Sequence, residues 1–339
     1  MTVKQIVFTQ KDTAKLLETE LRDIKPNEVL VKTHISTISC GTEKANITGD
    51  VNISIHEAAK AVAEFPRYAG YSTAGVVVKV GDEVETLKVG DKVAMYGTNH
   101  CEYNIATEKT AVKIPEGVSF NEAAMCFIGS FSIAALRKSK IEIGESCLIT
   151  GLGILGQLAV QYARVCGAVP IIVADMNPQR REMALSYGAD YALDPTDPDF
   201  VKTVKELTNG GVNVALEISG VGAGLLSCLD CMASFGRVVL EGCTRNCDFS
   251  VDFYRRVHGN GVSIIGANSN ARPTCESSKG LFTTHDDIKT ILNLCKGKRV
   301  DMKSLIKEIH TPKDCEEVYT RLVTDRNFPV CVQFDWEQL

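Results

Sequence analysis

Residues 146–175, SCLITGLGILGQLAVQYARVCGAVPIIVAD, decide the fold class of this chain. A short apolar run leads into a glycine-rich turn at 151–156, an amphipathic helix pattern follows, and a second apolar run ends in Asp175. This order of strand, glycine turn, helix, strand and acid is typical of a dinucleotide-binding unit. A glycine turn alone is weak evidence, but here both flanks fit, and the acid follows at about 20 residues, as the pattern requires.

The three glycines of the turn have separate expected roles. Gly151 allows a tight turn, Gly153 lets the backbone approach a pyrophosphate, and Gly156 lets the helix pack close to the strand. The helix begins around Ile154 and Leu155, and its unpaired N–H groups and positive dipole end face the phosphate groups. The sequence therefore predicts a pyrophosphate site at this turn.

Asp175 bears on the choice of cofactor. A carboxylate at the end of this strand accepts hydrogen bonds from the ribose hydroxyl groups and repels a 2′-phosphate, so it favours NAD over NADP. Arg180 and Arg181 follow shortly afterwards, and three roles are open to them: they flank the adenosine ribose, meet a phosphate or face solvent.

Length and composition indicate an ordinary globular protein of about two domains. The chain has 339 residues, of which 45% are hydrophobic and 23% are charged. The formal net charge of -5 argues against nucleic acid or an anionic membrane as a partner. No apolar run approaches transmembrane length, and the first residues lack a signal-peptide core, so we expect a cytoplasmic protein.

The chain has thirteen cysteines spread over its length, most of which we expect to be reduced and buried. Two pairs stand close together, Cys228 with Cys231 and Cys243 with Cys247, but neither forms a four-cysteine zinc motif. The first pair lies in a helical pattern, where core packing is favoured and redox or zinc roles stay open.

A β-rich part, residues 1–126 and 269–339, is interrupted by a unit of alternating strands and helices at 127–268. Such alternation predicts a doubly wound parallel sheet, so the fold class is α/β. Ser219, Gly220 and residues 241–243 end later strands of this sheet, at the edge where ligands gather. The expected strands of the unit are 147–150, 169–174, 212–218, 237–241 and 262–265, and its later helices are 178–187, 199–208 and 222–233. The expected elements of the β-rich part include strands 28–33, 74–80, 92–95 and 330–334 and helices 286–295 and 312–324.

Further strings extend the pattern beyond the glycine turn: GVVVKVGDEV at 75–84, VGDKV at 89–93 and LEISG at 216–220. With them, the chain resembles the medium-chain dehydrogenase/reductase superfamily, in its zinc-type alcohol and polyol dehydrogenase branch, over nearly its whole length. The resemblance implies a GroES-like β-rich catalytic domain with an inserted Rossmann domain that binds NAD. It also implies that Leu155 packs behind the nicotinamide ring, and that subunits pair into homodimers or homotetramers.

The zinc branch of this family binds its catalytic metal through a cysteine, a histidine and a later cysteine or aspartate. Cys40, in the string Ser-Cys-Gly-Thr-Glu, matches the first ligand, and Cys126 matches the last. The family's histidine is Tyr71 in this chain, and its relay histidine is Ala45. Two cysteines alone leave zinc under-coordinated. A zinc site completed by His100 and a metal-free site both stay open, and the lost histidine favours the metal-free site.

Without zinc, Tyr71 is the first candidate for acid/base catalysis, because a phenol exchanges a proton and donates to an oxyanion. Its alternative role is that of an aromatic wall. Thr42 matches the family's relay hydroxyl, with a turn hydroxyl as the alternative, and Glu43 is expected to form a structural ion pair. His100 is a candidate for acid/base chemistry, substrate binding or metal, or for a hydrogen-bonded structural role. The family's structural-zinc lobe is absent, since strand 92–95 runs almost directly into His100.

The sequence thus predicts an enzyme, an oxidoreductase that transfers hydride between NAD and a secondary alcohol or ketone. Polar strings at 254–258 and 268–273 favour a hydrophilic small-molecule substrate such as a sugar, polyol or cyclitol, and a surface or subunit-contact role is their alternative. Two other functions stay open. One is a zinc-free quinone or enoyl reductase, which Asp175 disfavours, and the other is a non-catalytic NAD-binding protein.

Overall fold

The computed structural model describes residues 1–53, 62–246 and 248–339, and the chain divides into two compact units. The first unit is Met1–Ile128, Ile288–Lys298 and Met302–Leu339, and the second is Gly129–Asp287 and Arg299–Asp301. The pattern of the sequence predicts domain boundaries after residues 126 and 268. In the structure, the residues from 269 to 287 pack with the second unit.

The described part of the second unit contains a six-stranded parallel sheet with the order β11-β10-β9-β12-β13-β14. Its strands are β9 (Cys147–Thr150), β10 (Ile171–Ala174), β11 (Tyr191–Leu193), β12 (Val212–Glu217), β13 (Met232–Leu240) and β14 (Ser263–Gly266). This is the strand order of the doubly wound dinucleotide-binding fold, in which the order reverses between the first and fourth strands. The predicted parallel sheet is confirmed, and the reversal lies between β9 and β12.

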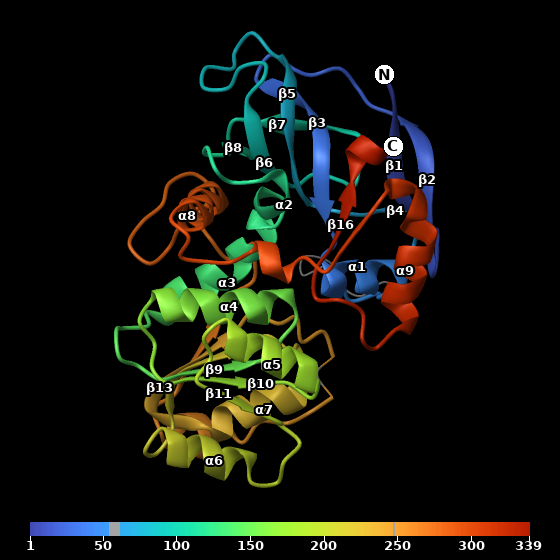
Figure 1. Ribbon diagram of the computed structural model, residues 1–339. Helices are drawn as coiled ribbons and strands as arrows, with labels where there is room; N and C mark the ends of the chain where they lie inside the picture. The colour runs from blue at the N-terminus through green and yellow to red at the C-terminus, as the bar shows by residue number, and fades with distance from the viewer. Residues whose placement is uncertain (54–61, 247) are drawn as a thin grey trace. The chain divides into compact units, whose positions relative to one another are not determined.

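Helices cover both faces of this sheet (Figure 1). On one face lie α4 (Ile154–Val165) and α5 (Pro178–Ser186), and on the other lie α6 (Phe200–Leu207) and α7 (Gly222–Asp230). Every residue of β9 and β10 is buried, because a sheet covered on both faces has no solvent side. The predicted helix 222–233 is too long at its end: Met232 pairs with Val212 and begins β13.

The close cysteine pairs differ in their surroundings. Cys228 and Cys231 are both fully buried in the apolar core of the second unit, so they pack as the sequence analysis favoured. Cys243 is exposed, and Cys247 lies outside the described residues.

The first unit is built mainly from antiparallel strands in two sheets, ordered β2-β1-β4 and β15-β16-β3-β5-β6-β8, with β7 paired to β3. The strands are β1 (Thr2–Gln10), β2 (Thr13–Glu20), β3 (Glu28–Thr37), β4 (Arg67–Tyr68), β5 (Ser72–Val80), β6 (Lys92–Tyr96), β7 (Tyr103–Thr107), β8 (Ala111–Lys113), β15 (Glu308–His310) and β16 (Val332–Asp335). The helices α1 (Cys40–Ile47), α2 (Phe120–Ala123) and α9 (Cys315–Thr324) pack with these strands. This β-rich architecture is the one expected from the GroES-like resemblance.

Two of the boundaries between the units fall within helices, α3 (Cys126–Ser139) and α8 (Thr284–Lys296). The second was predicted at 286–295, whereas α3 was not predicted at all. In the described ranges, none of the helices combines the length and the apolar character that crossing a bilayer requires.

Candidate functional site

The glycine-rich turn follows β9 at the carboxyl edge of the parallel sheet. Gly151 has a φ of +89°, and a Cβ on it would lie 2.8 Å from the backbone nitrogen of Ser219. A Cβ on Gly156 would lie 2.0 Å from the carbonyl oxygen of Gly151, whereas a Cβ on Gly153 would meet nothing within 4 Å. The fold itself therefore requires the first and third glycines, while the middle one borders open space at the N-terminus of α4.

Asp175 directly follows β10, and its carboxylate is turned toward the glycine-rich turn. It accepts hydrogen bonds from the backbone N–H of Leu152 at 2.7 Å and from that of Asn177 at 2.8 Å. The first contact fixes the acid against the turn, because Leu152 is the residue after Gly151. This is the place from which a carboxylate accepts bonds from a ribose.

The two arginines after Asp175 have protein partners. Arg181 donates to the carbonyl oxygen of Asp175 and to the carboxylate of Asp194, the latter at 3.0 Å. The carbonyl oxygen of Arg180 accepts a bond from the side chain of Gln157 at 2.8 Å, which ties α5 to α4. Arg181 is thus held by contacts that already neutralise its charge.

Ser219 and Gly220 follow β12, beside the glycine-rich turn. The hydroxyl group of Ser219 donates to the carboxylate of Glu217, and the N–H of Gly220 donates to the same oxygen at 3.1 Å. Burial raises the pKa of Glu217, and these donors oppose that shift.

The second unit therefore brings most of its predicted cofactor residues to one edge of the sheet, at the reversal between β9 and β12. The open approach at Gly153, the uncapped N-terminus of α4 and the oriented carboxylate of Asp175 fit a dinucleotide. The predicted cofactor residues that lie at this edge are Gly151, Gly153, Ile154, Leu155, Gly156, Asp175, Ser219 and Gly220.

In the first unit, the side chain of Tyr71 lies beside the start of α1. Its hydroxyl group donates a hydrogen bond to the hydroxyl oxygen of Ser39 and lies 3.4 Å from that of Thr42. Its ring packs edge-on against Phe127, with the ring centroids 5.3 Å apart. Tyr71 and Thr42 are half-buried and Ser39 is buried. The structure thus joins two predicted residues and adds Ser39, for which the sequence carries no motif signal.

His100 is fully buried, and both of its ring nitrogens have protein partners. Nδ1 lies 2.7 Å from the hydroxyl oxygen of Ser36, and Nε2 lies 3.1 Å from the carboxylate of Glu43. The same carboxylate accepts bonds from the N–H of Ser39, at 2.8 Å, and from the hydroxyl group of Tyr319. The geometry favours the structural role for His100 and shows the ion-pair contact that we expected of Glu43.

The thiols of Cys40 and Cys126 lie in settings that do not suit zinc. The sulfur of Cys40 lies 3.8 Å from the carbonyl oxygen of Pro329. The sulfur of Cys126 lies 3.6 Å from the carbonyl oxygen of Glu122. Across 1–53, 62–246 and 248–339, no three His, Cys, Asp or Glu side chains lie close enough to share a metal ion. The described residues therefore do not fit a catalytic zinc.

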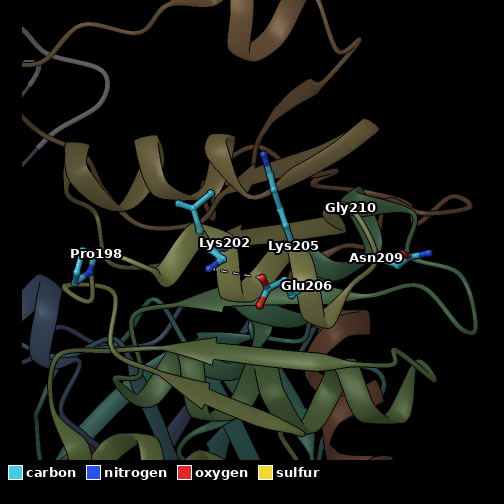
Figure 2. Close-up of a pocket in the computed structure, with 7 residues that line it drawn as sticks. Pro198, Lys202, Lys205, Glu206, Asn209 and Gly210 are labelled. Carbon is cyan, nitrogen blue, oxygen red and sulfur yellow. Dashed lines mark ion pairs between the residues drawn. The ribbon is translucent and has the colours of Figure 1, made fainter.

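An open depression on the surface of α6 is separate from these groups. Figure 2 shows Lys202 and Glu206, two of its lining residues one helical turn apart, as an ion pair, and their nitrogen and oxygen atoms are 4.0 Å apart. Its lining residues are Pro198, Val201, Lys202, Lys205, Glu206, Asn209 and Gly210. None of the predicted site residues is among them, so this depression has no part in the candidate site.

Comparison with known proteins matches this chain to dehydrogenases in both sequence and fold. The alcohol dehydrogenase GroES-like domain profile matches residues 25–141, and the zinc-binding dehydrogenase profile matches residues 155–284. The chain is 31% identical to L-threonine 3-dehydrogenase of Pyrococcus abyssi, over 75% of this chain and 79% of that protein. It is 27% identical to D-guloside 3-dehydrogenase of Escherichia coli, over 80% and 82%. Its fold matches that of benzyl alcohol dehydrogenase from Acinetobacter calcoaceticus with a TM-score of 0.84, at 20% identity and over 99% of each chain.

The fold and the dinucleotide site define an oxidoreductase that uses NAD. The chain belongs to the medium-chain dehydrogenase/reductase family, in its zinc-type alcohol dehydrogenase branch. It is an enzyme of the alcohol and polyol dehydrogenase class. The resemblance, fold class and cofactor expected from the sequence are therefore confirmed.

Proposed function

We propose that this protein interconverts a secondary hydroxyl group and a ketone on a sugar, polyol or cyclitol, and that Tyr71 and Ser39 handle the proton. The observation that carries the proposal is the hydrogen bond from Tyr71 to Ser39, at the position that matches the zinc-binding histidine of the family. The relatives support the substrate class, because guloside, threonine and sorbitol all carry hydroxyl groups on polar molecules.

Oxidation of an alcohol removes a hydride from carbon and a proton from oxygen. NAD, when bound, accepts the hydride. The phenolic oxygen of Tyr71 accepts the proton of the substrate hydroxyl while its own proton passes to Ser39, whose hydroxyl group releases its own proton to solvent. Thr42 lies 3.4 Å from the Tyr71 oxygen and is half-buried, so its hydroxyl group is a second acceptor for the Tyr71 proton. In the reverse direction, Tyr71 donates to the developing alkoxide.

The network behind Tyr71 keeps this pair in place. Glu43 accepts the N–H of Ser39, and the Glu43 carboxylate is itself held by His100 and Tyr319. Three donors around one buried carboxylate satisfy its charge, so the start of α1 has a defined position. His100 and Glu43 are thus positioning residues, and Cys40 and Cys126 take no chemical role.

We also propose a role for each of the two units of the chain. The first unit, Met1–Ile128 with Ile288–Lys298 and Met302–Leu339, is the catalytic and substrate domain. The second unit, Gly129–Asp287 with Arg299–Asp301, is the NAD-binding domain, and the enzyme works as a homodimer or homotetramer. A cytoplasmic location is supported by the cysteines, since each one in the described residues is a thiol and none is in a disulfide.

The experiment is a substrate screen. Sugars, polyols and cyclitols are offered with NAD, and NADH formation is followed by its absorbance, with Gly153→Val as the control that cannot hold the cofactor. We expect turnover by the wild-type protein on at least one polar secondary alcohol. NAD binding without turnover on any member would support the non-catalytic function, and reduction of quinones or enones alone would support the reductase.

A further inference from the structure

Two buried carboxyl groups lie at the ends of neighbouring strands in the second unit. Glu217 ends β12 and Glu241 directly follows β13, and the backbone N–H of Glu241 donates to the carbonyl oxygen of Glu217 at 3.0 Å. Their exposed fractions are 0% and 7%. Two buried acids on neighbouring strands do not both ionise cheaply, because each charge lacks hydration and the charge of Glu217 opposes that of Glu241.

The hydrogen bonds around Glu241 distinguish its two protonation states. The hydroxyl oxygen of Ser132, on α3, lies 2.6 Å from Oε1 of Glu241 and 3.0 Å from the carbonyl oxygen of Leu155. The other oxygen of Glu241 is buried and has no partner among the described residues. One serine hydroxyl has one hydrogen, so it cannot donate to both acceptors at once.

Only the neutral form of Glu241 uses both contacts. A protonated Glu241 donates to Ser132, and Ser132 then donates to Leu155. An ionised Glu241 would instead take the hydrogen of Ser132, release the Leu155 carbonyl and leave a charged oxygen buried without a donor.

The charged groups nearby agree with a neutral Glu241. Glu217 already accepts two hydrogen bonds, so it is the better place for the single negative charge. Arg272 favours ionisation of Glu241, but it is shared with Asp287 at 3.4 Å and with the carbonyl oxygen of Ser130 at 3.0 Å. Burial is the main cause that raises the pKa of Glu241 to about 8, with the charge of Glu217 adding to it.

We propose that Glu241 is a protonated carboxylic acid at neutral pH and a positioning residue that holds the first turn of α4 through Ser132. This inference rests on the proposed NAD site, because Leu155 lies in the turn that receives the pyrophosphate. It predicts that NAD binding weakens as the pH rises above about 8, when Glu241 ionises and Ser132 releases Leu155.

The protonation state is tested by infrared spectroscopy. We expect a C=O stretching band of a protonated carboxyl group at pH 7 that disappears as the pH is raised through about 8. The band should be absent from Glu241→Gln and unchanged in Glu206→Gln, an exposed acid of the same unit. A Glu241→Gln spectrum that retains the band overturns the proposal.

The positioning role is tested by NADH fluorescence titration between pH 7 and 9.5. We expect the Kd of the wild-type protein to rise about fivefold, the effect of one hydrogen bond, and that of Ser132→Ala to be about fivefold higher already at pH 7. Glu241→Gln keeps a neutral donor to Ser132, so its Kd for NADH should match that of the wild type at pH 7 and should not change up to pH 9.5. A Kd for Glu241→Gln that rises with pH as in the wild type overturns the positioning role. A wild-type protein that fails to bind NADH at any pH contradicts the proposed function instead, and the infrared band still decides the state of Glu241.

Discussion

The hydroxyl group of Tyr71 donates a hydrogen bond to the hydroxyl group of Ser39, which precedes α1. The two residues are 32 positions apart in the chain, and the fold brings them together because β5 and α1 both begin beside the same buried network. Thr42 stands next to them on α1. Three hydroxyl groups therefore lie together at the start of α1, and proton transfer between hydroxyl groups is the chemistry that such a set supports.

Zinc should not be needed for activity. Protein purified without a metal-affinity tag is expected to hold well below one zinc per chain by elemental analysis, and Cys40→Ser should keep most of its turnover. The reason is the donor set, because no three His, Cys, Asp or Glu side chains of the described residues lie close enough to share a metal ion. One zinc per chain that is lost in Cys40→Ser, together with activity, would establish Lewis-acid catalysis.

Replacing Asp175 by Ala should narrow the preference for NAD over NADP. The carboxylate accepts ribose hydroxyl groups and repels a 2′-phosphate, so its removal is expected to change the ratio of the two Kd values by at least about tenfold. Fluorescence titration with NADH and NADPH measures this ratio. Arg181→Ala is a suitable comparison, because Arg181 is already paired with Asp194. An unchanged ratio in Asp175→Ala would remove the acid from cofactor selection.

The glycine-rich turn offers a matched pair of substitutions. Gly153→Val should abolish NADH binding and leave the melting temperature unchanged, because a Cβ at this position meets nothing within 4 Å. Gly156→Ala should instead destabilise the protein by about 1 to 3 kcal/mol, since its Cβ would lie 2.0 Å from a carbonyl oxygen. Calorimetry and NADH titration separate the two effects. Tight NADH binding by Gly153→Val would show that the pyrophosphate lies elsewhere.

The buried network behind Tyr71 should contribute strongly to stability. Glu43→Ala leaves His100 and Tyr319 without their shared acceptor, and we expect a loss of about 1 to 3 kcal/mol in the free energy of unfolding for each orphaned group. Glu116→Ala, an exposed acid in the same unit, should change it by less than about 0.5 kcal/mol. Denaturant unfolding of both variants checks this. If Glu43→Ala and Glu116→Ala changed the free energy of unfolding by the same small amount, the contacts of Glu43 would not stabilise the protein.

The cofactor part of the site could be predicted because its signal is local. The glycines of the turn and Asp175 lie within one strand–helix–strand unit, so their spacing in the sequence fixes their positions in the fold. The end of α7 was predicted too late, because the pairing of Met232 with Val212 overrides the helical pattern there.

The proton-transfer part could not be predicted in full, because it depends on contacts between distant segments. Nothing in the sequence marks Ser39, whose role follows from its distance to Tyr71. Likewise, the sequence places Glu241 at a strand end, but only its burial and the position of Ser132 on an unpredicted helix indicate a neutral acid.

The turnover of Tyr71→Phe on the best substrate of the screen decides whether Tyr71 exchanges a proton with the substrate. We expect kcat to fall roughly 100- to 10,000-fold, the range for loss of a general acid or base, with the Kd for NADH unchanged. Ser39→Ala should show a smaller loss of kcat. A Tyr71→Phe enzyme with the kcat of the wild type would contradict the account, because its remaining ring can pack but cannot exchange a proton.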